Sequence, residues 1–356
     1  MNRLIEAYNR IDSGERISDD EAVMLLRDGD LLDLGRRAQK RMGAFHPPDR
    51  ATFQIDRNIN YTNVCVSKCR FCAFYREEHD PDAYVLPVDE IVTKVEEAVS
   101  RGATQVMLQG GLNPSLKLAY FETVLKELKS RFSLFIHSFS PPEIYFFAQQ
   151  ANMTVEEVLR VLKKAGLDSL PGGGAEILAD RVRRMISPHK VTTRQWLSVM
   201  EAAHRIGLKT TATMMMGSVE TIQERVEHML HIRTLQDKTG GFRAFIPWTF
   251  TTGNTELGGK ETSSIDYLKT LALSRIFFDN IENVQGSWVT QGKDIGQMSL
   301  FFGANDLGSI MLEENVVKAA GASNRITESE MVALIRGAGK IPMQRNTEYS
   351  IVKTYS

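Results

Sequence analysis

All three cysteines of the chain lie within one short stretch, at Cys65, Cys69 and Cys72. The spacing Cys-x3-Cys-x2-Cys lets a single loop wrap three thiolates around one metal centre. Three thiolates can ligate three irons of a cubic [4Fe–4S] cluster, which normally takes four protein ligands. Because the sequence has no fourth cysteine, one iron of such a cluster would be left open for another ligand.

Other sites could use the same thiols. A zinc site of the Cys3His type could add His79 to the three cysteines. However, their spacing is tighter than that of usual zinc-binding pairs, and no second pair follows downstream. A disulfide would leave one cysteine unpaired and would need an oxidising compartment. Three inert cysteines would have to cluster by chance, so the spacing favours the iron–sulfur cluster.

The composition is that of a globular protein with a large core, with 42% hydrophobic and 24% charged residues among 356. The 43 Lys and Arg residues are balanced by 44 Asp and Glu residues, so no basic surplus attracts a nucleic-acid backbone. Residues 1–16 lack the apolar core of a signal peptide, and no apolar run approaches membrane-spanning length. We therefore expect a cytoplasmic protein that binds neither nucleic acid nor membrane.

Short apolar segments alternate with amphipathic ones from residue 53 onward, and they predict about eight strands separated by helices. The strands are expected at 55–61, 105–108, 134–137, 169–170, 210–215, 244–246, 284–289 and 301–303. Strands that need both faces covered indicate a parallel sheet, and the repeated unit favours an α/β fold, a (β/α)8 TIM-type barrel. We expect this barrel to span 51–311.

The two ends of the chain are predicted to be helical. Residues 1–50 form a helical N-terminal lead-in, in which Ser18 can cap a helix that turns Ala22, Leu25 and Leu26 inward. Residues 312–356 form a helical C-terminal extension packed on the barrel, with a capped helix that begins near Thr327.

Two glycine-containing segments follow predicted strands, where a barrel places its functional loops. Gln109, Gly110 and Gly111 follow the second strand, and glycines there let the backbone approach a ligand closely. A plain turn between strand and helix is the alternative.

The glycine run that includes Gly173 and Gly174 is followed closely by Glu176, whose carboxylate can accept both hydroxyls of a ribose. The alternative is a tight turn with a solvated or helix-capping glutamate. Ile177 stands where a dinucleotide-binding fingerprint needs a glycine.

His137 and Ser140 lie at and after the end of another predicted strand. A lone histidine is often structural, but its expected position over the barrel mouth makes it a candidate catalytic residue.

Segments around these residues resemble the radical S-adenosylmethionine (SAM) enzymes of the futalosine pathway to menaquinone and their deazaflavin-forming relatives. The resemblance rests first on 57–65 and 69–75, where Phe71 supplies the aromatic residue expected before the last cysteine. Further matching segments are 137–143, 169–176, 212–215, 245–250 and 287–292. Together they cover most of the chain from about residue 50 to about residue 320.

The resemblance implies two cofactors. A [4Fe–4S] cluster would be held by Cys65, Cys69 and Cys72, and its open iron would chelate the amino and carboxylate groups of SAM. The residues implied to face SAM are Phe71, Gln109, Gly110, Gly111, Ser140, Gly173, Gly174 and Glu176. A reducing donor such as a flavodoxin or a ferredoxin would supply the electron.

The resemblance also implies a carbon–carbon bond-forming cyclisation of a nucleoside-like substrate, dehypoxanthine futalosine. A 5′-deoxyadenosyl radical would remove the ribose C4′ hydrogen, and the carbon radical would attack the benzoate ring. His137 is the nominee for the base that removes the last proton. The alternatives are an aminofutalosine synthase, a deazaflavin-forming enzyme and, outside this class, a non-catalytic iron–sulfur electron carrier.

Overall fold

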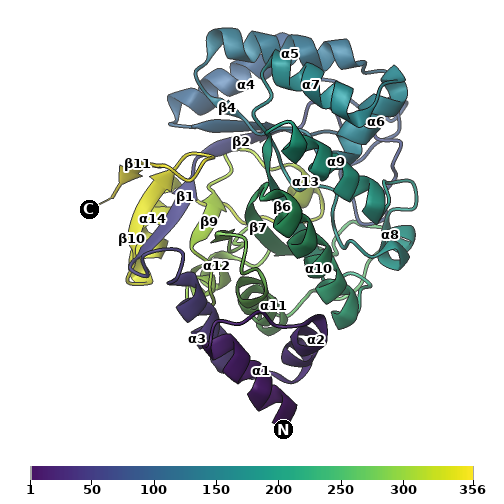
Figure 1. Ribbon diagram of the computed structural model, residues 1–356. Helices are drawn as coiled ribbons and strands as arrows, with labels where there is room; N and C mark the ends of the chain where they lie inside the picture. Colours follow the sequence, from purple (N-terminus) through teal and green to yellow (C-terminus); the bar gives the residue numbers. More distant parts are fainter. Residues whose placement is uncertain (1, 356) are drawn as a thin grey trace.

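A ring of parallel strands forms the centre of the fold in the computed structural model, which describes residues 2–355 (Figure 1). The strands of the ring are β1 Arg50–Gln54, β2 Asp56–Ile59, β3 Gln105–Leu108, β4 Phe135–Ile136, β5 Ser169–Leu170, β6 Lys209–Met216, β7 Phe242–Thr249, β8 Asn283–Val284 and β9 Asp306–Ser309. Only Ile55 separates β1 from β2, and the two act as one interrupted strand.

The pairing of these strands runs around the whole ring. One parallel set follows the order β2-β3-β4, and a second follows β5-β6-β7-β8. A bridge between His137 and Ser169 joins the two sets, and a bridge between Gln285 and Asp306 adds β9. β9 then pairs with β1, which closes the ring. The predicted (β/α)8 barrel is confirmed.

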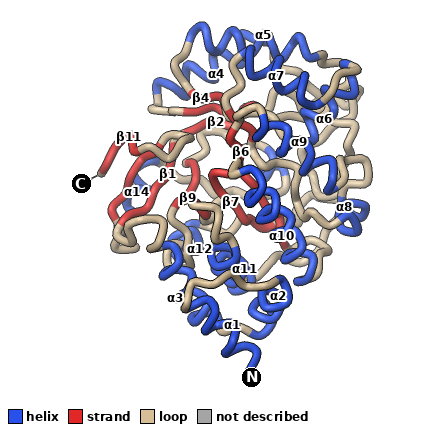
Figure 2. Tube along the Cα trace, viewed as in Figure 1, coloured by secondary structure: helices blue, strands red, loops and turns tan. Residues whose placement is uncertain are grey.

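Helices cover the outside of the ring (Figure 2). They are α4 Val88–Ser100, α5 Leu118–Arg131, α6 Pro141–Ala151, α7 Val155–Ala165, α8 Asp180–Ile186, α9 Thr193–Arg205, α10 Ile222–Thr239, α11 Ser264–Phe277 and α12 Lys293–Ser299. The bounds of α7 are set by a capping box at Thr154 and by Gly166 at its C-terminal end. Within residues 2–355, no helix is long and apolar enough to cross a membrane.

The predicted helical lead-in is present as α1 Asn2–Asp12, α2 Asp19–Asp28 and α3 Leu31–Met42. Ser18 caps α2 in a capping box with Glu21, and Ala22, Leu25 and Leu26 are buried as expected. α2 and α3 pack against α10 and α11, at the bottom of the view in Figure 1.

Two expectations for the last part of the chain are wrong. The predicted strand at 301–303 is a turn after α12, in which Phe301 is exposed and Gly303 has a φ of 94°. The last strand of the ring is β9 instead, because its backbone finds a partner in β1.

The C-terminal extension is only partly helical. α13 Val316–Ala319 is short, and α14 Glu328–Gly337 begins after a capping box at Thr327, as predicted. The chain then forms strands, β10 Ile341–Arg345 and β11 Ile351–Thr354. β10 pairs in parallel with β1, so its backbone bonds come from a partner almost 300 residues away rather than from a local helix.

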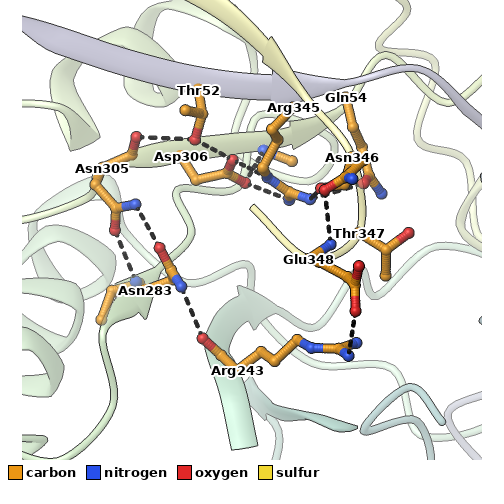
Figure 3. A network of polar contacts seen from close by, with 12 residues as sticks. Thr52, Gln54, Arg243, Asn283, Asn305, Asp306, Arg345, Asn346, Thr347 and Glu348 are labelled. Carbon is orange, nitrogen blue, oxygen red and sulfur yellow. Dashed lines mark hydrogen bonds and ion pairs between the residues drawn. The ribbon is translucent and has the colours of Figure 1, made fainter. Parts of the chain in front are cut away.

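A buried ion pair fixes this C-terminal segment to the barrel (Figure 3). Arg345 Nε lies 2.5 Å from Asp306 Oδ2, and Nη2 donates to Oδ1 over 2.9 Å. The two side chains are 5% and 0% exposed. Thr52 Oγ1 donates to the same carboxylate, so β1, β9 and β10 meet there. The charges are therefore paired as well as buried, which is the condition for tolerating them in a core.

We predict that Arg345→Ala lowers the free energy of unfolding by about 3–5 kcal/mol, because it leaves Asp306 buried without a partner. Denaturant titration of the purified protein measures this loss. Lys126→Ala, which breaks the exposed pair with Glu122, is the control and should change the midpoint little. Equal midpoints for both variants would show that the Arg345–Asp306 pair does not hold the segment.

Candidate active site

One cavity of about 390 Å³ collects every site residue that the sequence predicted. Those residues are Cys65, Cys69, Phe71, Cys72, Gln109, Gly110, Gly111, His137, Ser140, Gly173, Gly174 and Glu176. They come from the ends of four consecutive ring strands, β2 to β5, and from the loops that follow. As expected, these loops meet at the C-terminal ends of the strands.

The cysteine loop follows β2 and is held by its own backbone. Cys65 N donates to the carbonyl of Arg76 over 3.0 Å, and Cys72 N donates to the carbonyl of Cys69 over 3.0 Å. Cys69 is buried, whereas Cys65 and Cys72 are partly exposed. Burial raises the pKa of the Cys69 thiol to about 11 and also raises the pKa of Cys72. The thiolate forms therefore need a positive partner, and a metal centre supplies one.

A site for a single ion does not assemble in this loop. Among residues 2–355, no group of three or more His, Cys, Asp or Glu side chains is placed to hold one metal ion. His79, which the zinc alternative required, is exposed.

Gly110 and Gly111 let the cysteine loop approach the end of β3. A Cβ atom on Gly111 would lie 2.1 Å from the carbonyl oxygen of Val64, and one on Gly110 would lie 2.7 Å from the ring of Tyr61. Gly111 N donates to the carbonyl of Thr62 over 3.0 Å. Both glycines therefore have a structural function, close packing of two backbones, in addition to lining the cavity.

Glu176 forms an ion pair that the sequence did not indicate. Its side chain is 5% exposed, and Oε1 accepts a hydrogen bond from Lys190 Nζ over 2.7 Å. Lys190 Nζ also lies 5.2 Å from the centre of the Phe71 ring. Burial opposes the charge of Lys190, but Cys69 and Glu176 outweigh it and hold its pKa above the usual value. A permanent positive charge thus lies beside the cysteines. Glu176 does not cap α8, which begins at Asp180.

The glycine run that includes Gly173 and Gly174 is closely packed. A Cβ atom on Gly173 would lie 2.3 Å from Gln109 Nε2, and one on Gly174, whose φ is 75°, would lie 2.4 Å from Pro142. The buried Arg183 donates to the carbonyls of Gly174 and Ala175, which fixes the turn from below.

Glu143 is a second acid in the cavity that the sequence did not single out. Oε1 accepts from Tyr61 Oη over 2.6 Å and from Gly110 N over 3.2 Å, and Oε2 accepts from Ser140 Oγ over 2.5 Å. Burial is the main reason that the pKa of Glu143 is raised to about 7, while the three donors act against it. The carboxyl group therefore titrates near neutral pH.

His137 is a neutral imidazole in one defined tautomer. Ser169 Oγ donates its only proton to the carbonyl of Lys209 over 2.6 Å, so it must accept from His137 Nδ1 over 2.9 Å. Nε2 is left as a hydrogen-bond acceptor, and no partner for it is found within the described part of the chain. Burial, with smaller effects from the charges of Arg243 and Arg345, lowers the pKa of His137 to about 3.

We predict that the carboxylic-acid C=O band of Glu143 in the infrared spectrum disappears with a midpoint near pH 7. The folded state binds this proton more tightly than the unfolded chain, whose ordinary value is 4.5. The free energy of unfolding should therefore fall as the pH rises from 4.5 to about 7.

Glu143→Gln is the matched control for this titration, because it keeps the shape of the side chain and removes the titrating group. Other buried acids remain in the variant, so the difference spectrum isolates Glu143. A band lost entirely below pH 5 would contradict the burial of its charge.

Comparison with known proteins gives the family. Residues 59–232 match the model described as the radical SAM superfamily, and residues 239–356 match the CofH/MqnC C-terminal region. A solved structure of the FeFe-hydrogenase maturase HydG from Carboxydothermus hydrogenoformans superposes with a TM-score of 0.79 at 17% identity, over 98% of this chain and 81% of that one. At this identity the likeness supports the barrel fold alone.

Two relatives are much more similar in sequence. The cyclic dehypoxanthine futalosine synthase of Halalkalibacterium halodurans is 46% identical over 345 residues, which are 96% of this chain and 93% of the relative. The 5-amino-6-(D-ribitylamino)uracil–L-tyrosine 4-hydroxyphenyl transferase of Methanothermobacter thermautotrophicus is 44% identical over 310 residues, 85% of this chain and 84% of the relative. Radical SAM membership implies a [4Fe–4S] cluster and SAM, and the three cysteines have the spacing this requires. The chain belongs to the CofH/MqnC family of the radical SAM superfamily.

Proposed function

We propose that the chain closes a ring in dehypoxanthine futalosine, the substrate in the name of the relative that is 46% identical. The two kinds of relative differ little in identity, so identity alone does not choose between them. The synthases of Halalkalibacterium halodurans and Streptomyces coelicolor are 46% and 45% identical over 96% of this chain, whereas the transferase of Methanopyrus kandleri, aligned over 97%, is only 38% identical. The higher identity over nearly the whole chain is the observation that carries the choice of substrate.

Cys65, Cys69 and Cys72 would hold three irons of the [4Fe–4S] cluster, and the buried position of Cys69 fits a cationic occupant. When bound and reduced by a donor such as a flavodoxin or ferredoxin, the cluster and SAM supply a 5′-deoxyadenosyl radical that can remove a hydrogen atom from the ribose C4′. The protein positions the substrate and excludes water, because the cofactors carry out the difficult chemistry.

The wall beside the cysteines suits the SAM nucleoside. One oxygen of Glu176 is bound to Lys190, which leaves the other free to accept hydroxyl groups of the SAM ribose. Gly173 and Gly174 keep side chains out of that space, and Phe71 with Lys190 closes it on the cysteine side. Gln109 and Ser140 lie next to Gly173, and with Gly110 and Gly111 they extend the proposed SAM-binding wall.

His137 accepts the proton that restores the aromatic ring in the last step. The ring proton is on Nδ1, which donates it to Ser169 Oγ, so Nε2 presents a lone pair to the cavity. A pKa of about 3 makes the imidazole a weak base, but a proton on an oxidised ring carbon is very acidic. A weak base is therefore sufficient, and the positive charge of the oxidised ring passes to the imidazole together with the proton.

We predict that Gly111→Ala impairs cluster assembly without removing a ligand. Its Cβ would lie 2.1 Å from the Val64 carbonyl and would push the cysteine loop away. Anaerobic reconstitution should give about four irons per chain for the wild type and a small fraction of that for Gly111→Ala and for Cys69→Ser.

Gly43→Ala is the matched control for this experiment. Its φ is −62° and the nearest contact of a new Cβ is 3.4 Å away, so iron incorporation should stay complete. Full iron incorporation in Gly111→Ala would show that the glycine does not set the position of the cysteines.

We predict free 5′-deoxyadenosine as a co-product when the reduced, reconstituted enzyme acts on dehypoxanthine futalosine. Substrate deuterated at C4′ should pass its label to the 5′ carbon of that co-product. The organic product should be ring-closed and two hydrogens lighter than the substrate, because one hydrogen atom, one proton and one electron leave. Mass spectrometry of a single anaerobic reaction measures both compounds.

Each competing activity gives a different result when the substrates that it needs are supplied. Adenosine retained covalently in the product would indicate an aminofutalosine synthase. Conversion of tyrosine with 5-amino-6-(D-ribitylamino)uracil instead would indicate the transferase. A protein that takes up the cluster but never cleaves SAM would be an electron carrier.

A further inference from the structure

Two buried polar side chains on β2 lack hydrogen-bond partners. Asp56 and Asn58 line the cavity, and they are 3% and 4% exposed. Oδ1 of Asp56 and Oδ1 of Asn58 have no partner with hydrogen-bond geometry among the described residues, although the Ser309 hydroxyl lies close enough to the Asp56 carboxyl to oppose the rise in its pKa that burial causes. Asp56 and Asn58 stand two positions apart on one strand, so both side chains lie on the same face of the ring. Buried polar groups are almost always paired, so two neighbouring exceptions in one cavity point to a ligand.

The free oxygen of Asp56 is set by its neighbours. Oδ2 accepts from Gln54 Nε2 over 3.1 Å and from Gln105 Nε2 over 2.7 Å. Both amide NH2 groups are thus directed at one oxygen, which leaves Oδ1 for another donor.

The C-terminal segment fixes the orientation of these two amides. Arg345 Nη1 donates to Gln54 Oε1 over 2.7 Å, and Thr347 Oγ1 donates to Gln105 Oε1 over 2.6 Å. An amide whose oxygen is already engaged must present its NH2 group on the other side. Figure 3 shows Arg345, Thr347 and Gln54 together on this side of the barrel. Arg345 and Thr347 are therefore positioning residues for the carboxyl group of Asp56.

The charge of the cavity limits which ligand group can bind here. Lys190 is the only Lys or Arg among the described lining residues, and it is paired with Glu176. No arginine that could pair with a substrate carboxylate is therefore found among the described lining residues. An anionic group would meet the acceptors of Asp56 and Asn58 without a counter-ion. A hydroxyl group can instead donate to these acceptors without bringing a second negative charge into the cavity.

We propose that Asp56 and Asn58 bind the hydroxyl groups of the substrate's sugar. This inference rests on the proposed function and adds an orientation to it. The sugar lies against β2, and the aromatic ring of the benzoate lies among apolar lining residues such as Ile246, Trp248 and Val289. The two positions are about 6.6 Å apart along the strand, so one pentose can reach both.

Substrate binding to the reconstituted enzyme, with SAM and without reductant, tests this orientation. Asn58→Leu keeps the approximate size of the side chain and removes its hydrogen bonds. We expect the Kd for dehypoxanthine futalosine to rise about tenfold, the effect of one good hydrogen bond. The Kd for SAM and the iron content should not change. Asp56→Asn is the second, more conservative variant and should weaken binding in the same direction.

A substrate analogue that lacks one ribose hydroxyl separates recognition from a general disturbance. The analogue should bind the wild type more weakly than the parent substrate does. Its affinity for Asn58→Leu or Asp56→Asn should be little lower than its affinity for the wild type, because the missing hydroxyl and the missing side-chain group would belong to the same hydrogen bond. Thr193→Val, which removes a buried unpaired hydroxyl outside the cavity, is the matched control and should bind the parent substrate normally. Thr347→Val should weaken substrate binding while the melting temperature stays close to that of the control.

Two results would overturn the inference. One is unchanged substrate affinity in both Asn58→Leu and Asp56→Asn. The other is additivity, in which each substitution weakens binding of the deoxygenated analogue as much as it weakens binding of the parent substrate. Failure of the proposed function gives a different result, since the wild type would then not bind dehypoxanthine futalosine. In that case the same variants and a deoxygenated analogue are measured with the substrate that the enzyme does convert, and the same two results decide.

Discussion

The contact between the cysteine loop and the segment after β3 is the constraint on which the site depends. Val66 N donates to the carbonyl of Leu112, and Leu112 N lies 3.3 Å from Cys65 Sγ as its donor. These two hydrogen bonds need the backbones of both segments to lie close together. Gly111 permits this close approach, because any Cβ at this position would collide with Val64. The barrel therefore presents the three cysteines at one side of its cavity through backbone geometry, before any cofactor binds. The positions of the cysteines are therefore fixed by the ends of the barrel strands.

Charged side chains fix the part of the site around Glu176. Lys190 lies between the cysteines and Glu176, so a single cation stabilises thiolates on one side and orients a carboxylate on the other. Arg183 holds the backbone of the glycine run from beneath, which keeps Glu176 at its unusual φ of 43°. A non-glycine residue at such a φ is strained and persists only where its surroundings determine it. Here the surroundings are the buried Arg183 and the partly buried Lys190, and the carboxylate beside them is the one proposed to meet the SAM ribose.

The sequence was sufficient where the signal was local. The cysteine spacing, the glycines and the strand ends each depend on neighbours in the chain, and all the residues predicted from them line one cavity. Lys190 and Glu143 were missed because their partners are distant: Lys190 comes from the connection between α8 and α9, and Glu143 lies in α6, which the periodicity did not reveal. β10 and β11 were mistaken for helix because short strands gain their stability from β1, which local pattern does not show.

The two ends of the cavity are joined by one strand. β2 carries Asp56 and Asn58 along its length and leads directly into the cysteine loop after Ile59. A substrate held by those two side chains and a cofactor held by the cysteines would thus be positioned by the same rigid element. Hydrogen transfer requires the reacting atoms to be close and aligned, so a shared support removes one source of relative motion. Arg345 and Thr347 brace the near end of this strand, and Gly111 braces the loop at its far end. In the proposed orientation, the C-terminal segment would thus help to position the substrate, through Gln54 and Gln105.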